Sequence, residues 1–260
     1  MKLMTLNCHS WQEENQLEKI KVLAERIKKE QYDDIALQEI SQHINSEVMA
    51  GAIKKDNYVE VLIDELKKIG EEKYKYVWDF SHIGYDVFEE GLAILTRHEI
   101  KKSDSFYISK DTSETNYKSR KIIKASIEIN GEEIDIYSCH LGWWNDEEAP
   151  FRNQVDNLLS SMNQEKLSFL MGDFNNNAFI RGEGYDYLLN KGVVDTFTLA
   201  DTKDSGITVK GIIDGWKGCS EDKRLDLILC NKEIKVKDSK VIFNTDSTIV
   251  SDHFGVEIKL

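Results

Sequence analysis

Short apolar segments with the composition of β-strands recur along almost the whole chain, and this recurrence limits the fold more than any other feature. Such segments, bounded by Gly, Asn, Asp and Ser, are typical of strands in packed sheets. The predicted strands are Lys2–Leu6, Asp34–Leu37, Tyr76–Phe80, Gly91–Thr96, Ile122–Ile129, Ile134–Ser138, Leu167–Met171, Leu225–Leu229, Val236–Phe243 and Phe254–Ile258.

Fewer segments have the periodicity of helices. Apolar residues recur at helical spacing from Leu17 to Ile27, from Tyr58 to Ile69 and from Phe151 to Met162. No linker, repeat or low-complexity tract interrupts the chain. Many strands with few helices indicate an α+β sandwich, with two sheets packed face to face and helices outside. A length of 260 residues fits one domain over residues 1–260.

Composition limits the binding partners and the cellular compartment that we expect for this protein. The formal net charge of -13, with 47 Asp and Glu against 34 Lys and Arg, repels nucleic acid and anionic membranes. Cys8, Cys139, Cys219 and Cys230 show no CxxC or metal-binding spacing, which is typical of reduced intracellular thiols. No signal peptide or bilayer-length apolar segment is present, so we expect a cytoplasmic protein without membrane contact.

Several predicted strands lead directly into polar side chains. One of these sites is the stretch "MGDFNNN", residues 171–177. A turn or a helix cap explains any one of them, but the repetition predicts a polar cleft where the strand ends converge. The polar residues that follow strands are Asn7, Glu39, His140, Asp173, Asn175, Asp252 and His253.

The kinds of side chain in this set favour phosphoester hydrolysis. Oxygen donors without clustered Cys or His are typical ligands of a hard cation such as Mg²⁺ or Mn²⁺, and not of zinc. Imidazoles beside such a cation can stabilise phosphoryl charge or transfer protons near neutral pH. Asp173 can hold an attacking water. Metal-assisted hydrolysis of a phosphoester uses all of these groups.

The motifs also resemble those of a known superfamily in the same order. "TLN", "IALQE", "GDFN", "RLDLIL" and "SDH" are similar to the motifs of the endonuclease/exonuclease/phosphatase superfamily, and the match spans nearly the entire chain. The resemblance implies a DNase I-like fold, a four-layer α/β/β/α sandwich of two packed, mainly antiparallel sheets. Its active site would lie at one end of the two sheets.

The resemblance implies a metal site and a water-activating group. Glu39 would be the principal Mg²⁺ ligand, with Asn7 beside it and Asp252 nearby. Asp173 would orient or deprotonate the water, and Asn175 would hold the water or a phosphate oxygen. The alternatives for single positions are a chain turn at Asn7 and a helix cap at Glu39.

The imidazoles of His140 and His253 would complete the active site that the resemblance implies. His253 would contact phosphoryl oxygens, with Asp226 fixing its tautomer, unless Asp226 is only a half-buried strand residue. His140 stands where phosphatase, sphingomyelinase and DNase I-like members carry His, whereas exonuclease III-type apurinic endonucleases carry Tyr. This difference points away from abasic-site repair. We further expect Glu90 to orient His140, and the role of His9 stays open.

The substrate class follows from charge and from aromatic residues. A nuclease needs cations to bind a polyanion, which a chain at -13 lacks, so we expect a small phosphomonoester and not a nucleic acid. Trp143 and Trp144 can stack on a sugar ring, although either could be core. Arg120 is a candidate phosphate contact or a surface residue. "DFSHIGYDVFEEG" and "RGEGYDYLL" add polar and aromatic groups typical of carbohydrate pockets.

A closer resemblance names a substrate. "NCHSWQEENQLEKI", "DFSHIGYD", "SCHLGWWNDEE", "MGDFNN", "RGEGYDYLL" and "DSGITVKGIIDGW" look like the maltose 6'-phosphate phosphatases of Firmicutes. This resemblance implies hydrolysis of maltose 6'-phosphate to maltose and phosphate in the cytoplasm. The alternatives are a Mg²⁺-dependent nuclease of the same superfamily and a non-catalytic binding protein with the same fold. The oligomeric state, the number of metal ions and the roles of Asn176 and Asn177 stay open.

Overall fold

The computed structural model describes residues 1–260. The strands are β1 (Lys2–Asn7), β2 (Asp34–His43), β3 (Val48–Ala50), β4 (Ile53–Lys54), β5 (Lys75–Gly84), β6 (Phe88–Thr96), β7 (Glu99–Tyr107), β8 (Lys121–Ile129), β9 (Glu132–His140), β10 (Ser168–Asp173), β11 (Val194–Asp195), β12 (Ala200–Lys203), β13 (Asp226–Cys230), β14 (Val236–Ile242) and β15 (Gly255–Lys259). The helices are α1 (Gln16–Glu30), α2 (Tyr58–Lys68), α3 (Phe151–Ser160), α4 (Gly184–Asn190) and α5 (Thr196–Leu199).

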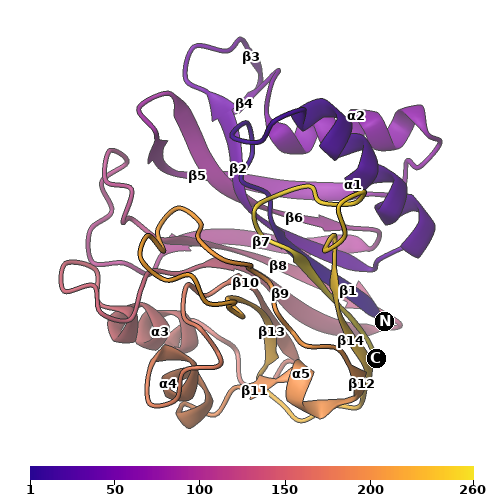
Figure 1. The fold of residues 1–260 in the computed structure, drawn as a ribbon. Coiled ribbons are helices and arrows are strands. Elements are labelled where there is room, and N and C mark those ends of the chain that lie inside the picture. Colours follow the sequence, from indigo (N-terminus) through magenta and orange to yellow (C-terminus); the bar gives the residue numbers. More distant parts are fainter.

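Two large sheets form the body of the molecule (Figure 1). The strand order is β12-β14-β15-β1-β2-β6-β5 in one sheet and β11-β13-β10-β9-β8-β7 in the other, and β3 and β4 form a small separate ribbon. Most neighbours are antiparallel. The parallel pairs are β1–β2, β9–β10 and β12–β14, and the first two are joined by the crossover helices α1 and α3.

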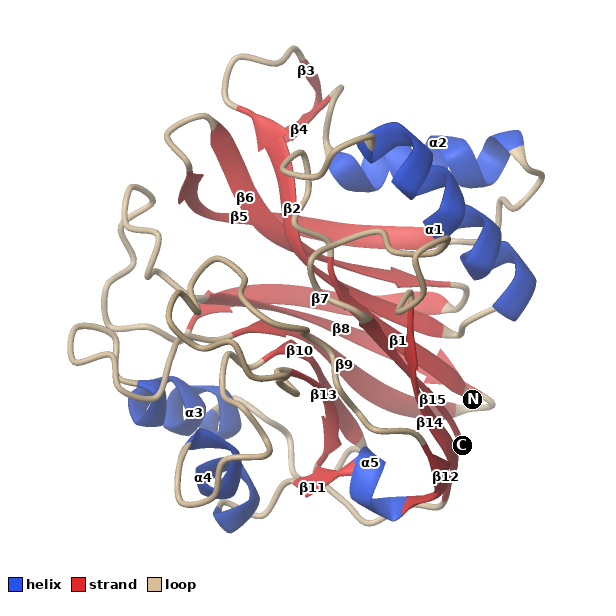
Figure 2. Cartoon of the chain, viewed as in Figure 1, coloured by secondary structure: helices blue, strands red, loops and turns tan.

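Three apolar layers hold the sandwich together. One cluster packs α1 and α2 on the outer face of the seven-stranded sheet, a second fills the space between the sheets, and a third packs α3 and α4 on the outer face of the six-stranded sheet. Figure 2 shows α1 and α2 on one side of the strands and α3 and α4 on the other. The expected four-layer α/β/β/α sandwich with mainly antiparallel sheets is confirmed.

The helices form where the sequence pattern predicts them. α1 buries Ile20, Leu23, Ala24 and Ile27 on one face, and the chain leaves the helix at Gln31, a left-handed residue whose N–H donates to the carbonyl of Ile27. The spacing of three and four residues puts these side chains on one stripe, so burying them against the sheet holds the helix in place.

Two elements longer than four residues were missed in the sequence. β7 (Glu99–Tyr107) is a polar edge strand whose only neighbour is β8, so its side chains lack the apolar alternation of a half-buried strand. The seven-residue helix α4 is too short to show a clear helical period. The predicted strand at Asp34–Leu37 also continues to His43, because the chain passes through a β-bulge and resumes its pairing with β6.

Polar side chains between the sheets lie directly behind the candidate site. Gln38 Nε2 donates to Ser138 Oγ over 3.0 Å, and Ser138 Oγ donates to the carbonyl of Leu37 over 3.0 Å. Since Gln38 is on β2 and Ser138 on β9, these bonds fix the relative position of the two sheets where their functional side chains meet.

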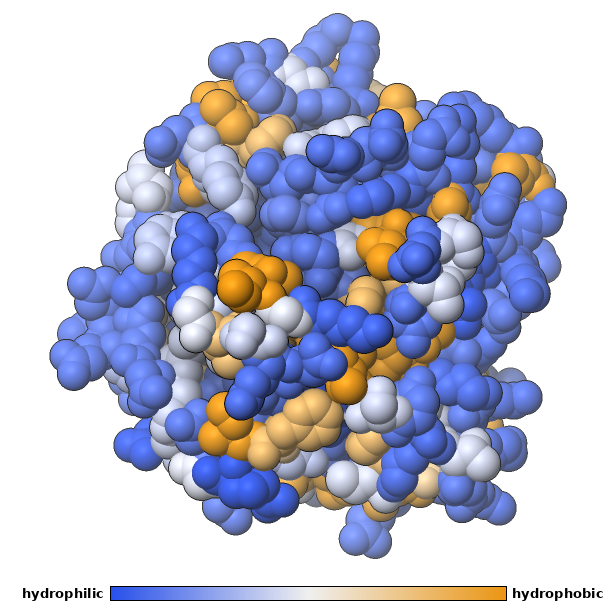
Figure 3. Space-filling model, in the orientation of Figure 1, coloured by the Kyte–Doolittle hydropathy of each residue, from blue (hydrophilic) through white to orange (hydrophobic).

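The surface is largely polar on the face shown in Figure 3, where apolar residues appear in small scattered groups. None of the helices combines the length and the apolar character needed to cross a membrane.

Candidate active site

A row of three functional side chains runs across the six-stranded sheet. The strand register places Asp173, the last residue of β10, beside His140, the last residue of β9, and beside Asp226, the first residue of β13. All three are buried. Hydrogen-bonded neighbours in a sheet bring side chains close together, so the pairing of these strands alone assembles this part of the site.

The seven-stranded sheet contributes an amide and a carboxylate to the same place. Asn7 ends β1 and donates from Nδ2 to Glu39 Oε1 over 2.8 Å and to Asp173 Oδ2 over 3.2 Å. Glu39 was expected at the end of a strand, but it lies within β2 at the bulge, where its φ of 51° re-aims the side chain. Asn7 therefore links the two sheets through their functional groups.

His253 completes the central group from the loop before β15. Its Nδ1 lies 2.9 Å from Asp226 Oδ2 and donates to it, which leaves Nε2 facing Asp173 Oδ2 at 3.8 Å. His140 Nε2 lies 3.7 Å from the same Asp173 oxygen. These separations are too long for direct hydrogen bonds, and a water or a phosphoryl oxygen that lies beside both atoms of a pair could contact them together.

The two imidazoles have opposite protonation behaviour. Burial opposes the charged form of His253, but the carboxylates of Asp226 and Asp173 outweigh it and hold the pKa of His253 well above its usual value. For His140, burial and then the Arg120 guanidinium hold the pKa well below its usual value. Near neutral pH His253 is therefore cationic and His140 is neutral.

The carboxylates of the site suit a hard cation. Burial, followed by the carboxylates of Glu90 and Asp252, raises the pKa of Glu39 to about 7. Burial also raises the pKa of Asp173 to about 7, although the charge of His253 opposes the shift. No Lys or Arg forms an ion pair with Glu39, Asp173 or Asp252, whose recorded charged neighbours are imidazoles. An oxygen-rich pocket whose carboxylates have no Lys or Arg partner fits Mg²⁺ or Mn²⁺.

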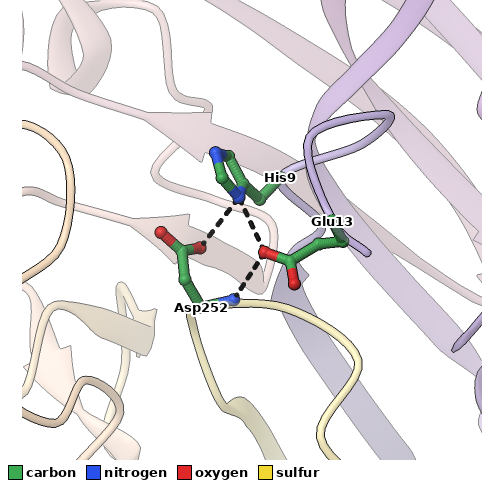
Figure 4. Close-up of side chains that lie close together, drawn as sticks. All are labelled: His9, Glu13 and Asp252. Carbon is green, nitrogen blue, oxygen red and sulfur yellow. Dashed lines mark hydrogen bonds and ion pairs between the residues drawn. The ribbon is translucent and has the colours of Figure 1, made fainter. Parts of the chain in front are cut away.

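Figure 4 shows a second group of side chains, His9, Glu13 and Asp252, and the charge of Glu39 also acts on His9. His9 Nδ1 lies 2.7 Å from Glu13 Oε1 and 3.7 Å from Asp252 Oδ1, while the backbone N–H of Asp252 donates to Glu13 Oε1 over 3.2 Å. Burial opposes protonation of His9, but these carboxylates raise its pKa to about 9. The position of Asp252 thus depends on Glu13, a residue that the sequence motifs did not single out.

The remaining residues of the "MGDFNNN" loop have structural partners. Asn175 N donates to Asp173 Oδ1 over 2.8 Å, and its side-chain amide is fixed at both ends, by Trp216 Nε1 on Oδ1 and by the Leu141 carbonyl on Nδ2. Asn176 Nδ2 donates to two backbone carbonyls, and Asn177 Oδ1 accepts from two backbone N–H groups. Asn176 and Asn177 therefore shape the loop.

Gly172 permits the close approach of β10 to β9. It adopts a φ of 151°, and a Cβ at this position would come within 1.9 Å of the Cys139 carbonyl oxygen. Any other residue would therefore push the strands apart where Asp173 and His140 must stay adjacent.

Arg120 indicates an anion-binding site beside His140 and Asp173. Its side chain is buried, with 4% of the residue exposed, and it forms no ion pair. Nη1 lies 3.5 Å from His140 Nε2, and Nε has no hydrogen-bond partner. A buried guanidinium without a carboxylate partner is costly unless an anion binds it, so the expected phosphate contact at Arg120 fits the structure.

The two adjacent tryptophans lie in different environments. Trp143 lines the cleft, with the Arg120 guanidinium 5.5 Å from its ring centroid. Trp144 turns to the helical layer, where its ring meets Phe151 at 6.1 Å and Tyr187 at 6.0 Å. Trp144 does not line the cleft, so the geometry does not support its expected contact with substrate.

Glu90 lines the cleft but does not contact His140 by a hydrogen bond. Its Oε1 lies 3.4 Å from Nε2 of His82, which the sequence motifs did not single out. The structure thus pairs Glu90 with a different imidazole from the one we expected. β5 and β6 pair His82 with Glu90 in register, a contact that could not be recognised without knowing the strand pairing.

Most of the residues described above line one cleft of about 740 Å³. We call its deep part the floor: Glu39, His140, Asp173 and His253 line it, Asn7 and Asp226 hydrogen-bond to them from behind, and Arg120 lies beside them. We call its outer part the rim, formed by Tyr85, Tyr117, Lys118, Trp143, Asp146, Asp214 and Lys217. The rim residues lie in segments outside the strands and helices, which Figure 2 shows in tan.

A buried lysine shapes the rim segment that contains Asp214 and Lys217. Lys223 is fully buried, and its Nζ donates to the carbonyls of Gly211, Cys219 and Glu221 over 2.7, 2.9 and 2.8 Å. These bonds satisfy the ammonium group and fold residues 211–223 around it. The segment "RGEGYDYLL" does not line the cleft; Tyr185 within it packs in the α4 layer.

Comparison with known proteins identifies the family. Residues 4–253 match the Endonuclease/Exonuclease/phosphatase family, and the chain belongs to it. Members of this family are hydrolases, and they generally use a divalent metal ion, for which the oxygen donors of the floor are suited. A search of curated proteins by sequence found no match.

Solved structures share the fold over the full length of the chain. An endonuclease/exonuclease/phosphatase family protein from Leptotrichia buccalis is 42% identical with a TM-score of 0.93, covering 100% of this chain and 99% of that one. A mannosyl-6-phosphatase from Bacteroides thetaiotaomicron is 17% identical with a TM-score of 0.73, covering 100% and 98%. Truncated TDP2 from Caenorhabditis elegans is 18% identical with a TM-score of 0.65, covering 99% and 95%. The last two similarities show the fold alone.

Proposed function

We propose that the protein is a metal-dependent phosphomonoesterase that hydrolyses a sugar phosphate, with maltose 6'-phosphate as substrate and maltose and phosphate as products. The single observation that carries the proposal is Arg120, a buried guanidinium without an ion-pair partner, placed beside the floor. Together with a protonated His253 it provides two positive charges, which suit the dianion of a phosphomonoester. The resemblance to maltose 6'-phosphate phosphatases supports the choice of sugar.

The floor residues have distinct roles in this reaction. Asp173 holds the attacking water and accepts its proton, while Asn175, fixed by Trp216 and Leu141, presents its amide to the water or a phosphate oxygen. His253, fixed by Asp226, donates from Nε2 to a phosphoryl oxygen as negative charge develops.

Glu39, Asn7 and Asp252 are the proposed ligands of a divalent cation. When bound, such a cation would neutralise phosphoryl charge and favour attack by water. Asn7 also holds the Glu39 and Asp173 carboxylates together by donating to both, so it positions the ligand and the proposed base at once. We infer that residues 1–260 act as one catalytic domain, since the site draws on residues from both ends of the chain.

The rim supports a small substrate over a nucleic acid. Lys118 is paired with Asp146 at 2.9 Å and with Glu148 at 2.6 Å, and Lys217 is paired with Asp214 at 2.9 Å. Cations engaged in this way offer little charge to further phosphates, whereas nuclease affinity depends on such contacts. The four free cysteines fit the cytoplasm, the compartment that we propose for the reaction.

The direct test is phosphate release by the purified protein with Mg²⁺. Maltose 6'-phosphate, glucose 6-phosphate, trehalose 6-phosphate and an abasic-site DNA duplex are compared in parallel, with EDTA as the metal-free control. We expect phosphate release from maltose 6'-phosphate with the highest kcat/KM, and loss of activity in EDTA. Cleavage of the duplex without turnover of any sugar phosphate would contradict the proposal and favour the nuclease.

A further inference from the structure

Tyr85 lies at the rim of the cleft on a strained turn. Between β5 and β6, Val87 N donates to the Gly84 carbonyl over 3.2 Å, while Tyr85 and Asp86 both adopt left-handed conformations, with φ of 51° and 60°. Turns with two successive left-handed residues favour Asn-Gly, because the left-handed region is unfavourable for large side chains. Backbone strain of this kind is concentrated at ligand-binding sites.

The Tyr85 hydroxyl extends across the cleft to a distant segment. It donates to Asp214 Oδ2 over 3.3 Å, and both residues line the cleft. Tyr85 is 54% exposed, so much of its ring is free to contact a ligand. A long hydrogen bond in contact with solvent has a small net stability, and a ligand hydroxyl can replace it with little loss.

Asp214 is held in position by its neighbours. Gly215 follows it with a φ of 76°, and a Cβ at Gly215 would come within 2.8 Å of the Trp143 ring. The backbone of this segment therefore packs directly on Trp143. Lys217 Nζ binds Asp214 Oδ1 at 2.9 Å, which leaves Oδ2 to Tyr85 and to the cleft.

The charges of the rim favour a ligand with neutral hydroxyl groups over one with a second phosphate. Its lysines are paired with Asp146, Glu148 and Asp214, so the groups left to bind a ligand are carboxylate oxygens and aromatic faces. Carboxylates accept hydrogen bonds from hydroxyls and repel a second phosphate. Aromatic faces pack against the C–H groups of a sugar ring.

We propose that Tyr85 and Asp214 form a binding subsite for the leaving group of the substrate, a neutral carbohydrate. The Tyr85 ring packs against the sugar, Asp214 accepts hydrogen bonds from its hydroxyls, and the Tyr85–Asp214 bond opens as the sugar enters. This subsite extends the proposed function. It rests on that function, because the sugar is the leaving group of the proposed reaction.

The test is calorimetric titration of maltose into the metal-free protein, because maltose binding needs neither a metal ion nor turnover. Tyr85→Leu removes the aromatic ring that packs against the sugar and is expected to weaken maltose binding about 2- to 10-fold. Asp214→Asn is expected to weaken it about tenfold or more, as loss of a hydrogen bond to a charged group does. Tyr187→Leu and Asp156→Asn are matched controls, since Tyr187 Oη donates to Asp156 over 3.0 Å in a pair that does not line the cleft. The controls should bind maltose like the parent protein.

Two results would overturn the subsite: a parent protein that does not bind maltose, or Tyr85 and Asp214 variants that bind it like the controls. Failure of the proposed function is a separate result. A protein that binds maltose through Tyr85 and Asp214 but releases no phosphate from sugar phosphates would retain the subsite and lose the proposed reaction. Phosphate release from sugar phosphates, together with unchanged maltose binding in the Tyr85 and Asp214 variants, would retain the proposed reaction and overturn the subsite.

Discussion

The floor and the rim of the cleft are built in different ways. The floor takes His140, Asp173 and Asp226 from paired strands, where the sheet register fixes their spacing and burial keeps them rigid. The rim takes Tyr85 and Asp214 from segments between strands, joined by one long hydrogen bond. From this difference we expect the fold to set the chemistry and the segments between strands to select the substrate.

The largest effect is expected at the centre of the floor. Asp173→Asn keeps the shape of the side chain but removes the group that accepts the proton of water, so kcat should fall about 10²- to 10⁴-fold. Steady-state phosphate release measures the loss. Asp135→Asn is the matched control in the neighbouring strand, where Asp135 pairs with Lys124 at 2.6 Å. This control should lower the melting temperature and leave kcat unchanged. Equal losses of kcat in the two variants would contradict a catalytic role that is specific to Asp173.

A smaller loss is expected when the support of His253 is changed. Asp226→Asn weakens the hydrogen bond that orients the imidazole and removes a carboxylate that raises its pKa. Changes to such supporting residues lower activity about 10- to 100-fold. The pH profile of kcat gives the sharper readout, because the limb that reports deprotonation of His253 should move to lower pH. An unchanged profile would mean that His253 does not act as a cation.

Metal binding should stabilise the floor in a pH-dependent way. Since burial raises the pKa values of Glu39 and Asp173 to about 7, the metal-free protein loses stability as the pH rises through 7 and these buried carboxyls ionise. Mg²⁺ at about 100 times its Kd should raise the melting temperature by about 5–10 °C. The increase should be larger at pH 8 than at pH 6, where protons compete.

Differential scanning fluorimetry with Mg²⁺ and with EDTA measures this effect. Glu39→Gln removes one proposed ligand and should abolish most of the increase. A shift that is the same in this variant, or larger at pH 6, would place the metal elsewhere.

The smallest effect separates the two tryptophans. Trp143→Phe at the rim should raise KM about 2- to 10-fold with little change in kcat, the loss expected for one aromatic contact. Trp144→Phe should leave KM unchanged and lower the melting temperature, because its ring packs against Phe151 and Tyr187. Parallel kinetics and melting curves of the two variants decide the assignment. A KM effect at Trp144 would contradict the boundary between the rim and the helical layer.

The sequence reveals much of the floor because apolar strands that end in polar residues are visible without a structure. Asn7, His140 and Asp173 each end a strand, as their positions after apolar runs predict. The placement of Glu39 could not be foreseen, since a β-bulge leaves no clear trace in the hydrophobic pattern. Glu90 was matched to His140, whereas the pairing of β5 with β6 brings it to His82.

The sequence reveals less of the rim because its contacts join residues that are far apart in the chain. Tyr85 and Asp214 are 129 residues apart, and neither belongs to a periodic segment. Lys223 looks like a surface charge in the sequence, yet it is fully buried among backbone carbonyls. Trp143 and Trp144 are adjacent, and only the path of the chain after β9 decides which of them meets the cleft.

The most direct test of the division between floor and rim is a crystal structure of the protein with Mg²⁺, inorganic phosphate and maltose, the products of the proposed reaction. We expect phosphate between Arg120, His253 and Asp173, and maltose against Tyr85 and Asp214 at the rim. Phosphate bound away from the floor, or maltose bound outside the rim, would contradict the account.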